Sequence, residues 1–241
     1  MMGCRLHQQG LSLLELTLSS GIASALLLLI LQLFSYSNSI GLEHQRLSRQ
    51  LENAASVRHL LSHSVRDALF VDLSESQFND PQQSCLGIFQ NQVCYPPFQS
   101  WKQGSIGPVV SPAVVPDSYL IWLKQSCCPG VIADLWFLAY RGGSNANPPS
   151  LFRRRQFSDG RFSASEEVVE GVSQLTPELT LALRDEMDES LVYMTGLSPE
   201  HIDNWWAVAA VQFHVSMGLT TTATANNKNY SFFVAARQWA R

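Results

Sequence analysis

GLSLLELTLSSGIASALLLLILQLF occupies residues 10–34 and contains a single formally charged residue, Glu15. The run from Leu16 to Phe34 is 19 residues long and consists mainly of Leu, Ile, Ala, Ser and Thr. At a rise of about 1.5 Å per residue it would form roughly 28 Å of helix, about the thickness of a bilayer's hydrocarbon core. The sequence therefore predicts a transmembrane helix over residues 11–36.

A secretory signal peptide is the first alternative, because Arg5 precedes the apolar run. The run is longer than the usual core of about 7 to 15 residues, and no clear small-x-small cleavage site follows it. Ser35 and Ser37 keep this alternative open. Glu15 argues against it, because a carboxylate without a partner in lipid costs at least ~2.5 kcal/mol. The presence of a carboxylate within this apolar segment therefore needs an explanation.

The segment Gly10-Leu11-Ser12-Leu13-Leu14-Glu15-Leu16-Thr17-Leu18 resembles the signature of the type IV pilin-like family. In that family a prepilin peptidase cuts after the glycine, and the new N-terminal residue is N-methylated. The resemblance implies a leader peptide of residues 1–10, cleavage between Gly10 and Leu11, and methylation of Leu11. The chain departs from the commonest pattern in having Leu11 where phenylalanine is usual.

The same resemblance implies a subunit-docking role for Glu15, which would meet the N-terminal amine of a neighbouring subunit. An ammonium and a carboxylate enter an apolar filament core together far more cheaply than either does alone. A pair of this kind also fixes the register between subunits. We therefore expect Glu15 to be a docking group and not a catalyst.

The apolar run continues into a predicted amphipathic helix over residues 37–69. Its apolar positions recur at spacings typical of one helix face, with charged residues between them. These positions are Ile40, Leu47, Leu51, Ala54, Leu61, Val65 and Ala68. Because no proline interrupts residues 11–69, one nearly continuous helix is expected, with a separate anchor and coiled-coil linker as the alternative.

Residues 70–241 are expected to form a β-rich periplasmic domain, because short apolar runs alternate there with Pro, Gly, Asn and Ser. The predicted strands are Tyr119–Lys124, Ile132–Tyr140, Leu151–Phe157, Val168–Val172, Leu191–Met194, Trp206–Met217 and Tyr230–Gln238. Residues 96–116, 142–149 and 220–229 are predicted loops, and residues 179–189 a helical or irregular segment. The predicted class is α+β, with the long helix covering an antiparallel sheet.

Within the pilin-like class, three C-terminal blocks look like the PilW-type minor pilins. The blocks are Pro149–Arg154, Val168–Val172 followed by Leu175, and Tyr230–Val234. They also suit the J-type minor pseudopilins of type II secretion. The resemblance implies other minor pilins and the major pilin as partners, with prepilin peptidase and inner-membrane lipid as further contacts.

The chain has five cysteines, of which Cys4 lies in the predicted leader. An even set of four in an exported domain favours disulfides. Cys85 and Cys94 are separated by eight residues, a suitable size for a disulfide-closed loop. The adjacent Cys127 and Cys128 could form a vicinal disulfide, cross-link to the first two or stay reduced, so the connectivity is open.

Other chemistry finds little support in the sequence. No nucleophile elbow, P-loop or dinucleotide-binding turn occurs, so neither an enzyme nor a cofactor is expected. Adjacent cysteines do not fit a zinc knuckle, and His59 and His63, although four residues apart, are interpreted as surface residues and not as metal ligands. The net charge of -4 does not indicate the positively charged surface that binds nucleic acid. Arg153–Arg155 are expected to alternate across a strand.

These patterns predict a minor pilin that takes part in type IV pilus assembly and lies in the bacterial inner membrane with its C-terminal domain in the periplasm. A minor pseudopilin of type II secretion is the close alternative. The alternative from another class is a bitopic periplasmic enzyme or sensor with an uncleaved anchor. That alternative predicts an intact Met1 and tolerance of Glu15→Ala.

Overall fold

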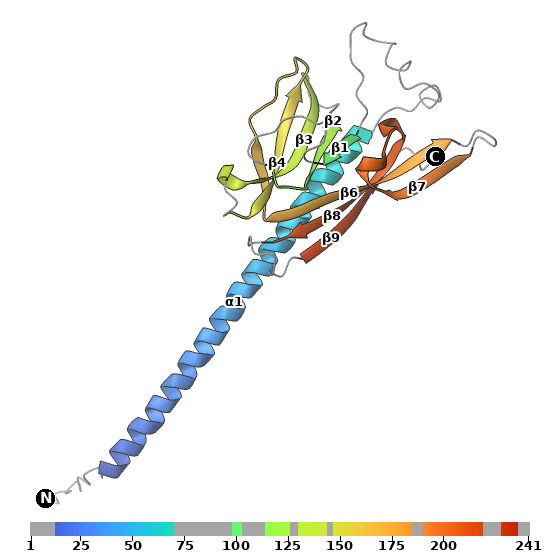
Figure 1. Ribbon diagram of the computed structural model, residues 1–241. Helices are drawn as coiled ribbons and strands as arrows, with labels where there is room; N and C mark the ends of the chain where they lie inside the picture. The colour runs from blue at the N-terminus through green and yellow to red at the C-terminus, as the bar shows by residue number, and fades with distance from the viewer. Residues whose placement is uncertain are drawn as a thin grey trace, which may run out of the picture. The chain divides into compact units, whose positions relative to one another are not determined.

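The computed structural model describes residues 13–69, 98–102, 114–125, 130–143, 147–184, 190–218 and 228–235 (Figure 1). The chain divides into two compact units, residues 1–49 and 50–241. One long helix, α1 (Leu13–Leu69), is followed along the chain by antiparallel sheets. The predicted α+β class is therefore confirmed, whereas the predicted ends of the leader, the membrane span and the periplasmic domain stay predictions.

The 57 residues of α1 contain no proline and are rich in leucine and alanine, which favour helix. Glu15 lies in the first turn and Arg66 in the last turn, so their charges complement the partial charges of the helix ends. The helix continues through Gly21 and Gly41 without interruption. The predicted continuous helix is confirmed over the described residues.

Within the second unit, α1 buries one stripe of side chains spaced three or four residues apart. The stripe consists of Ala54, Val57, Leu61, Val65 and Ala68, each at most 9% exposed. This spacing places them on one helix face. Leu51, predicted on the same face, is 51% exposed instead, and the burial of Val57 was not predicted.

The first sheet is an antiparallel meander in the order β1-β2-β3-β4-β5. Its strands are β1 (Phe98–Lys102), β2 (Tyr119–Lys124), β3 (Val131–Tyr140), β4 (Pro149–Phe157) and β5 (Glu166–Glu170). Side chains of β3 are buried on both faces of the sheet. Trp136 and Leu138 join the cluster that contains the α1 stripe, while Leu135 and Phe137 join a second cluster on the opposite face.

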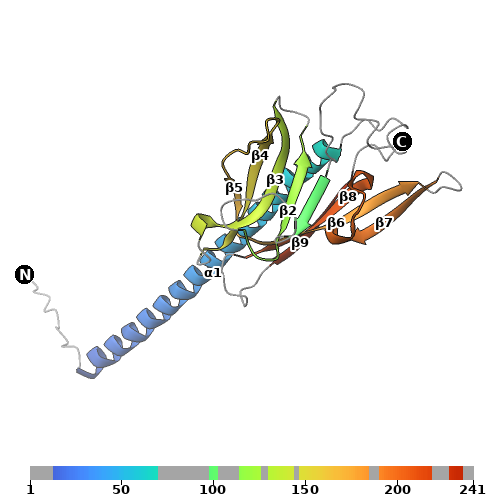
Figure 2. The ribbon, with the colours of Figure 1, turned by 45° about the horizontal axis from the view of Figure 1, so that its top comes forward.

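The second sheet has the order β7-β6-β8-β9 and is also antiparallel. Its strands are β6 (Val172–Arg184), β7 (Leu191–Leu197), β8 (Val208–Met217) and β9 (Lys228–Ala235). The first part of β6 pairs with β8 and its last part with β7, so β6 and β7 extend as a ribbon past β8 (Figure 2). This geometry places β7 and β9 at the two edges of the sheet.

The chain passes from the first sheet to the second at a single residue, Gly171. Its φ of 77° lies in the left-handed region that glycine adopts without a steric penalty. The Gly171 amide donates to the Pro149 carbonyl at 3.1 Å, and the Gly171 carbonyl accepts from the Gly218 amide at 2.9 Å. These bonds tie the corner to β4 and to the end of β8, so the two sheets share one corner.

Both sheets and the α1 stripe contribute to one hydrophobic core. Phe98 and Trp136 come from the first sheet and Phe213 from the second, and all three are fully buried. Phe213 also packs against Phe232, with ring centroids 5.3 Å apart. The helix and both sheets are needed to enclose this core, because each of these layers covers only one face of the next.

Three predictions of local structure were wrong. The single strand predicted at Val168–Val172 is divided at Gly171 between β5 and β6, which belong to different sheets. The predicted loop at residues 96–116 contains β1, whose five residues pair with β2. The segment predicted as helical or irregular at residues 179–189 begins within β6, a strand of 13 residues. The strand was not predicted because it contains Pro177, and proline usually interrupts a central strand. Pro177 is tolerated because it lies where β6 pairs with β8 alone.

Replacing Leu61 by alanine should lower the free energy of unfolding by about 2 to 5 kcal/mol, because Leu61 is fully buried in the core. Leu51→Ala is the matched control on the same helix and should cost less than about 0.5 kcal/mol. Urea denaturation of the full chain in detergent, followed by tryptophan fluorescence, measures both. Equal losses would contradict the assignment of the buried stripe.

Candidate functional site

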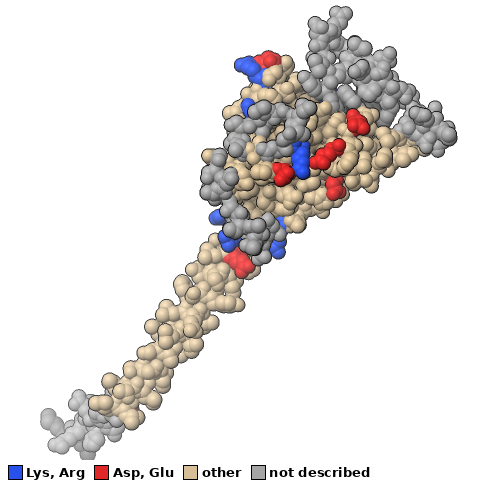
Figure 3. Space-filling view, in the orientation of Figure 1, with Lys and Arg blue, Asp and Glu red and all other residues tan. Residues whose placement is uncertain are grey.

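The first unit presents an apolar helical surface. Along residues 13–42 the large apolar side chains are exposed, with fractions between 82% at Leu13 and 38% at Ile40. On the face shown in Figure 3 this stretch carries no blue or red side chain. Among the described residues, α1 is the one helix long and apolar enough to cross a membrane.

Four hydroxyl groups in the first turns of this surface donate hydrogen bonds to the backbone of the same helix. Thr17, Ser20 and Ser24 donate to carbonyls three or four residues earlier, at 2.8 to 3.0 Å. Ser19 donates to the Glu15 carbonyl at 2.7 Å. Polar groups in an apolar medium need internal partners. These hydroxyls therefore leave the helix surface compatible with lipid or with another apolar helix.

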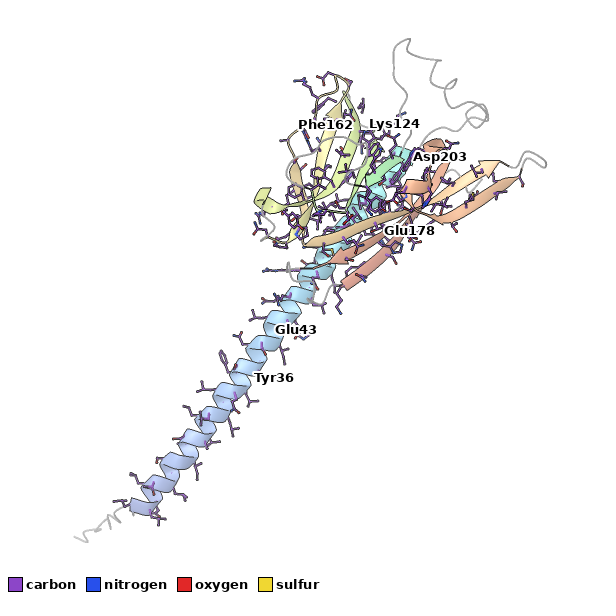
Figure 4. The ribbon with its side chains drawn as sticks, viewed as in Figure 1. Tyr36, Glu43, Lys124, Phe162, Glu178 and Asp203 are labelled. Carbon is purple, nitrogen blue, oxygen red and sulfur yellow. The ribbon has the colours of Figure 1, made fainter. Side chains whose placement is uncertain are left out.

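Glu15 is the only acidic residue in the first turn of α1. After it, the 27 residues from Leu16 to Leu42 carry no formal charge, and Glu43 is the next charged residue (Figure 4). The carboxylate at position 15 thus lies at the helix N-terminus, where the helix dipole favours negative charge. The predicted cleavage residues Gly10 and Leu11 lie outside the described residues.

The cysteines predicted to form disulfides also lie outside the described residues; they are Cys85, Cys94, Cys127 and Cys128. In the part of the chain that the structure describes, no three His, Asp or Glu side chains come together as metal ligands. Trp205 is half-buried and packs against the core, where it stacks on Phe98 with ring centroids 6.1 Å apart. Because the four cysteines lie outside the described residues, the disulfide prediction rests on the sequence alone.

A polar cavity of about 310 Å³ lies between the last turns of α1 and the first sheet. Its lining contains His59, Leu60, His63, Ser64, Asp67, Gln125, Val131, Asp134, Arg153 and Arg155. His63 is exposed, as predicted, and its Nδ1 lies 2.8 Å from Oδ2 of Asp67 one turn later. No pattern in the sequence predicts that the two histidines and the arginines lie together.

Asp134 is the buried charge of this cavity, with an exposed fraction of 5%. Its Oδ2 accepts a hydrogen bond of 3.0 Å from Nε2 of Gln125, and its Oδ1 lies 4.0 Å from Nε of Arg155. Burial raises the pKa of the Asp134 carboxyl, and this effect exceeds the opposing influence of Arg153 and Arg155. The sequence signal that could have revealed this residue is a lone acid within the apolar run of β3.

The three arginines of β4 alternate across the first sheet, as predicted. Arg153 donates from Nη2 to Oε2 of Glu166 at 2.8 Å, and its guanidinium lies over Trp136. Arg154 points to the other face, where it lies over Phe162. The hydrogen bond from Arg153 lowers the pKa of Glu166. Arg154 is thus separated from Arg153 and Arg155, which both line the polar cavity.

The described residues define a pilin-like architecture, in which a long apolar N-terminal helix precedes antiparallel sheets. Comparison with protein-family models, with curated proteins and with solved structures finds no match to this chain.

Asp134→Asn should raise the midpoint of thermal unfolding at pH 7, because it removes a carboxylate whose burial is unfavourable. A carboxyl with a raised folded-state pKa contributes most below its unfolded pKa of about 4, and this contribution is lost as pH rises. The advantage of the variant should therefore shrink as pH falls and vanish below about pH 4.

Glu166→Gln is the control and should lower the midpoint of thermal unfolding at pH 7, because the Glu166 pKa is lowered in the folded chain. Its stabilising contribution is present at pH 7 and is lost as pH falls through its folded-state pKa. Thermal unfolding of the full chain in detergent between pH 3 and pH 7 measures both variants. A lower midpoint for Asp134→Asn at pH 7 would contradict the unfavourable burial of this charge.

Proposed function

We propose that the chain is a prepilin-processed minor pilin of the bacterial inner membrane. Residues 11–36 anchor it, its sheets lie in the periplasm, and it primes or caps a type IV pilus with other minor pilins. The observation that carries this proposal is the exposed apolar surface of α1 over residues 13–42, with one carboxylate, Glu15, at its start.

The exposed surface requires an apolar partner. Lipid provides it before assembly, and the helices of neighbouring subunits replace the lipid in a filament. Helices associate in an apolar medium through close packing, which small residues permit. Thr17, Gly21 and Ala25 lie one turn apart and line a shallow hollow on α1. The small side chains at this hollow permit the close approach of a neighbouring helix.

Glu15 has no charged neighbour in sequence between Leu11 and Leu42. After cleavage at Gly10, the amine of Leu11 in the next subunit is the cation available at the same level of a helix bundle. An ion pair in this apolar setting is far cheaper than two separate charges. Helices that shift along one another lose the pair, so Glu15 sets the register of assembly.

This role is one of recognition, and the proposal assigns no catalytic activity to the chain. Prepilin peptidase acts on its leader, and the major pilin and other minor pilins contact the mature helix. A minor pseudopilin of type II secretion would use the same groups. An anchored periplasmic sensor is the rival from another class, and the polar cavity at Asp134 is the observation that favours it.

The mature chain should begin at Leu11 and carry one added methyl group, about 14 Da heavier than the bare polypeptide. Intact-mass spectrometry of the membrane-extracted chain, with and without the cognate prepilin peptidase, measures this. The strain without peptidase is the control and should retain Met1. A chain that keeps Met1 when the peptidase is present refutes processing and favours the anchored sensor.

Glu15→Gln should abolish incorporation into filaments while leaving membrane insertion intact. The amide cannot pair with the ammonium, whereas it enters lipid more readily than a carboxylate, which costs about 2.5 to 3.5 kcal/mol at mid-bilayer. Glu43→Gln is the matched control on the same helix. Immunoblots of sheared filaments and of membranes compare the two. Equal incorporation of both variants would contradict the docking role.

A further inference from the structure

The β6–β7 ribbon carries an exposed apolar edge. Four consecutive side chains of β7 are 42% to 48% exposed, namely Leu191, Val192, Tyr193 and Met194. The strand itself contains no charged residue and no proline. Natural edge strands usually carry such residues, because an unprotected apolar edge pairs with other chains. The edge of β7 therefore has the character of an interface.

The ribbon also lacks a third strand. Residues 182–184 of β6 pair with residues 191–193 of β7, whereas the pairing of β6 with β8 ends at Leu181 (Figures 1 and 2). In the described part of the chain no strand pairs with the other side of β7. A two-stranded hairpin is marginally stable in water, and a third strand stabilises it.

The opposite edge of the same sheet offers a complementary strand. β9 pairs with β8 on one side, and in the described ranges no strand covers its other side. The sheet has four antiparallel strands, so β7 and β9 run in opposite directions. A second copy in the same orientation thus brings its β9 antiparallel to β7. Antiparallel ladders are the more stable kind.

The side chains of the two edges match face by face. Val192 and Met194 lie on the inner face, opposite Leu183 and Leu181. Tyr230 and Phe232 occupy the inner face of β9, opposite Val215 and Phe213. On the outer face, Leu191 and Tyr193 would meet Phe233, which is 58% exposed. Pairing the two edges would therefore continue the apolar inner face of the sheet and would bring three exposed apolar side chains together on the outer face.

The charges at one end of this strand pair have opposite signs. Lys228 begins β9, and Glu200 lies three residues after β7, where its carboxylate is also 4.0 Å from Nζ of Lys102. An antiparallel pair places the start of β9 opposite the end of β7, so these charges favour this direction of pairing.

We propose that β7 of one chain pairs with β9 of a second copy, joining their four-stranded sheets edge to edge. The contact is heterologous, so each added copy exposes a new free edge and the assembly stays open. The inference rests on the proposed function only for the common orientation of neighbouring chains, which a shared membrane anchor provides.

A photo-cross-linking residue at position 192 tests this contact in membranes that contain equal amounts of unlabelled and ¹⁵N-labelled full chains. The expected product joins position 192 to the peptide that contains residues 228–235, with mixed isotope content. A cross-link to β7 of a second copy, to another protein, or to the same chain alone would overturn the proposal. Probe incorporation at the exposed Ala164 is the control and should give no such product.

Met194→Lys, combined with the probe at position 192, should reduce the mixed-isotope product about tenfold, because it places an unpaired charge within an apolar strand pair. Ala164→Lys should leave it unchanged. Since Met194 is 46% exposed, the folded domain should survive, and its unfolding midpoint checks this. An undiminished product in the folded Met194→Lys chain refutes the edge contact.

Repeating the cross-link in the Glu15→Gln chain separates the two proposals. Persistence of the 192 to 228–235 product supports the edge contact even where filament incorporation fails. Absence of the cross-linked product in the wild-type chain, with filament incorporation intact, would refute the proposed contact between β7 and β9. The proposed function would be unaffected by that result.

Discussion

Packing of the α1 stripe into the core of the two sheets is the interaction on which the rest of the second unit depends. Leu61 and Val65 belong to a cluster to which every strand contributes a buried residue or a partly buried neighbour, β7 through Leu197 alone. Neither sheet alone closes this core, because each has one face directed toward it. The corner at Gly171 then fixes how the chain divides its strands between the sheets.

The two parts of α1 are both helical, but their side chains suit different surroundings. Residues 54–68 alternate apolar and polar positions with helical spacing, so only one face is buried. Residues 16–42 are uncharged on every face, and the hydroxyls of Thr17, Ser19, Ser20 and Ser24 bond to the backbone. Such a surface is stable only where water is absent, which is the physical basis for placing it in lipid or in a helix bundle.

The sequence predicted those elements whose periodicity is strong. The long helix and β2, β3, β4, β7, β8 and β9 appear close to their predicted positions, because apolar runs and alternation dominate there. β6 was missed because Pro177 interrupts its pattern, and β1 because Phe98–Lys102 is short and lies between prolines. Of the candidate sites, Glu15 could be recognised from its charge within an apolar run. The cavity at Asp134 could not, because cross-strand register and helix packing bring its residues together.

Anchoring in a membrane changes how much contact an assembly needs. Free domains lose translational and rotational freedom when they associate, at an estimated 4 to 15 kcal/mol, so a seven-residue strand edge would hold them weakly. Chains confined to one membrane with a common orientation have already lost much of that freedom, and their effective concentration is correspondingly high. Under that constraint the proposed Glu15 ion pair would need only to set register, and the proposed β7 contact would need only to select a neighbour. The low charge of both surfaces is consistent with this division, since apolar groups would supply the attraction and the few charges the alignment.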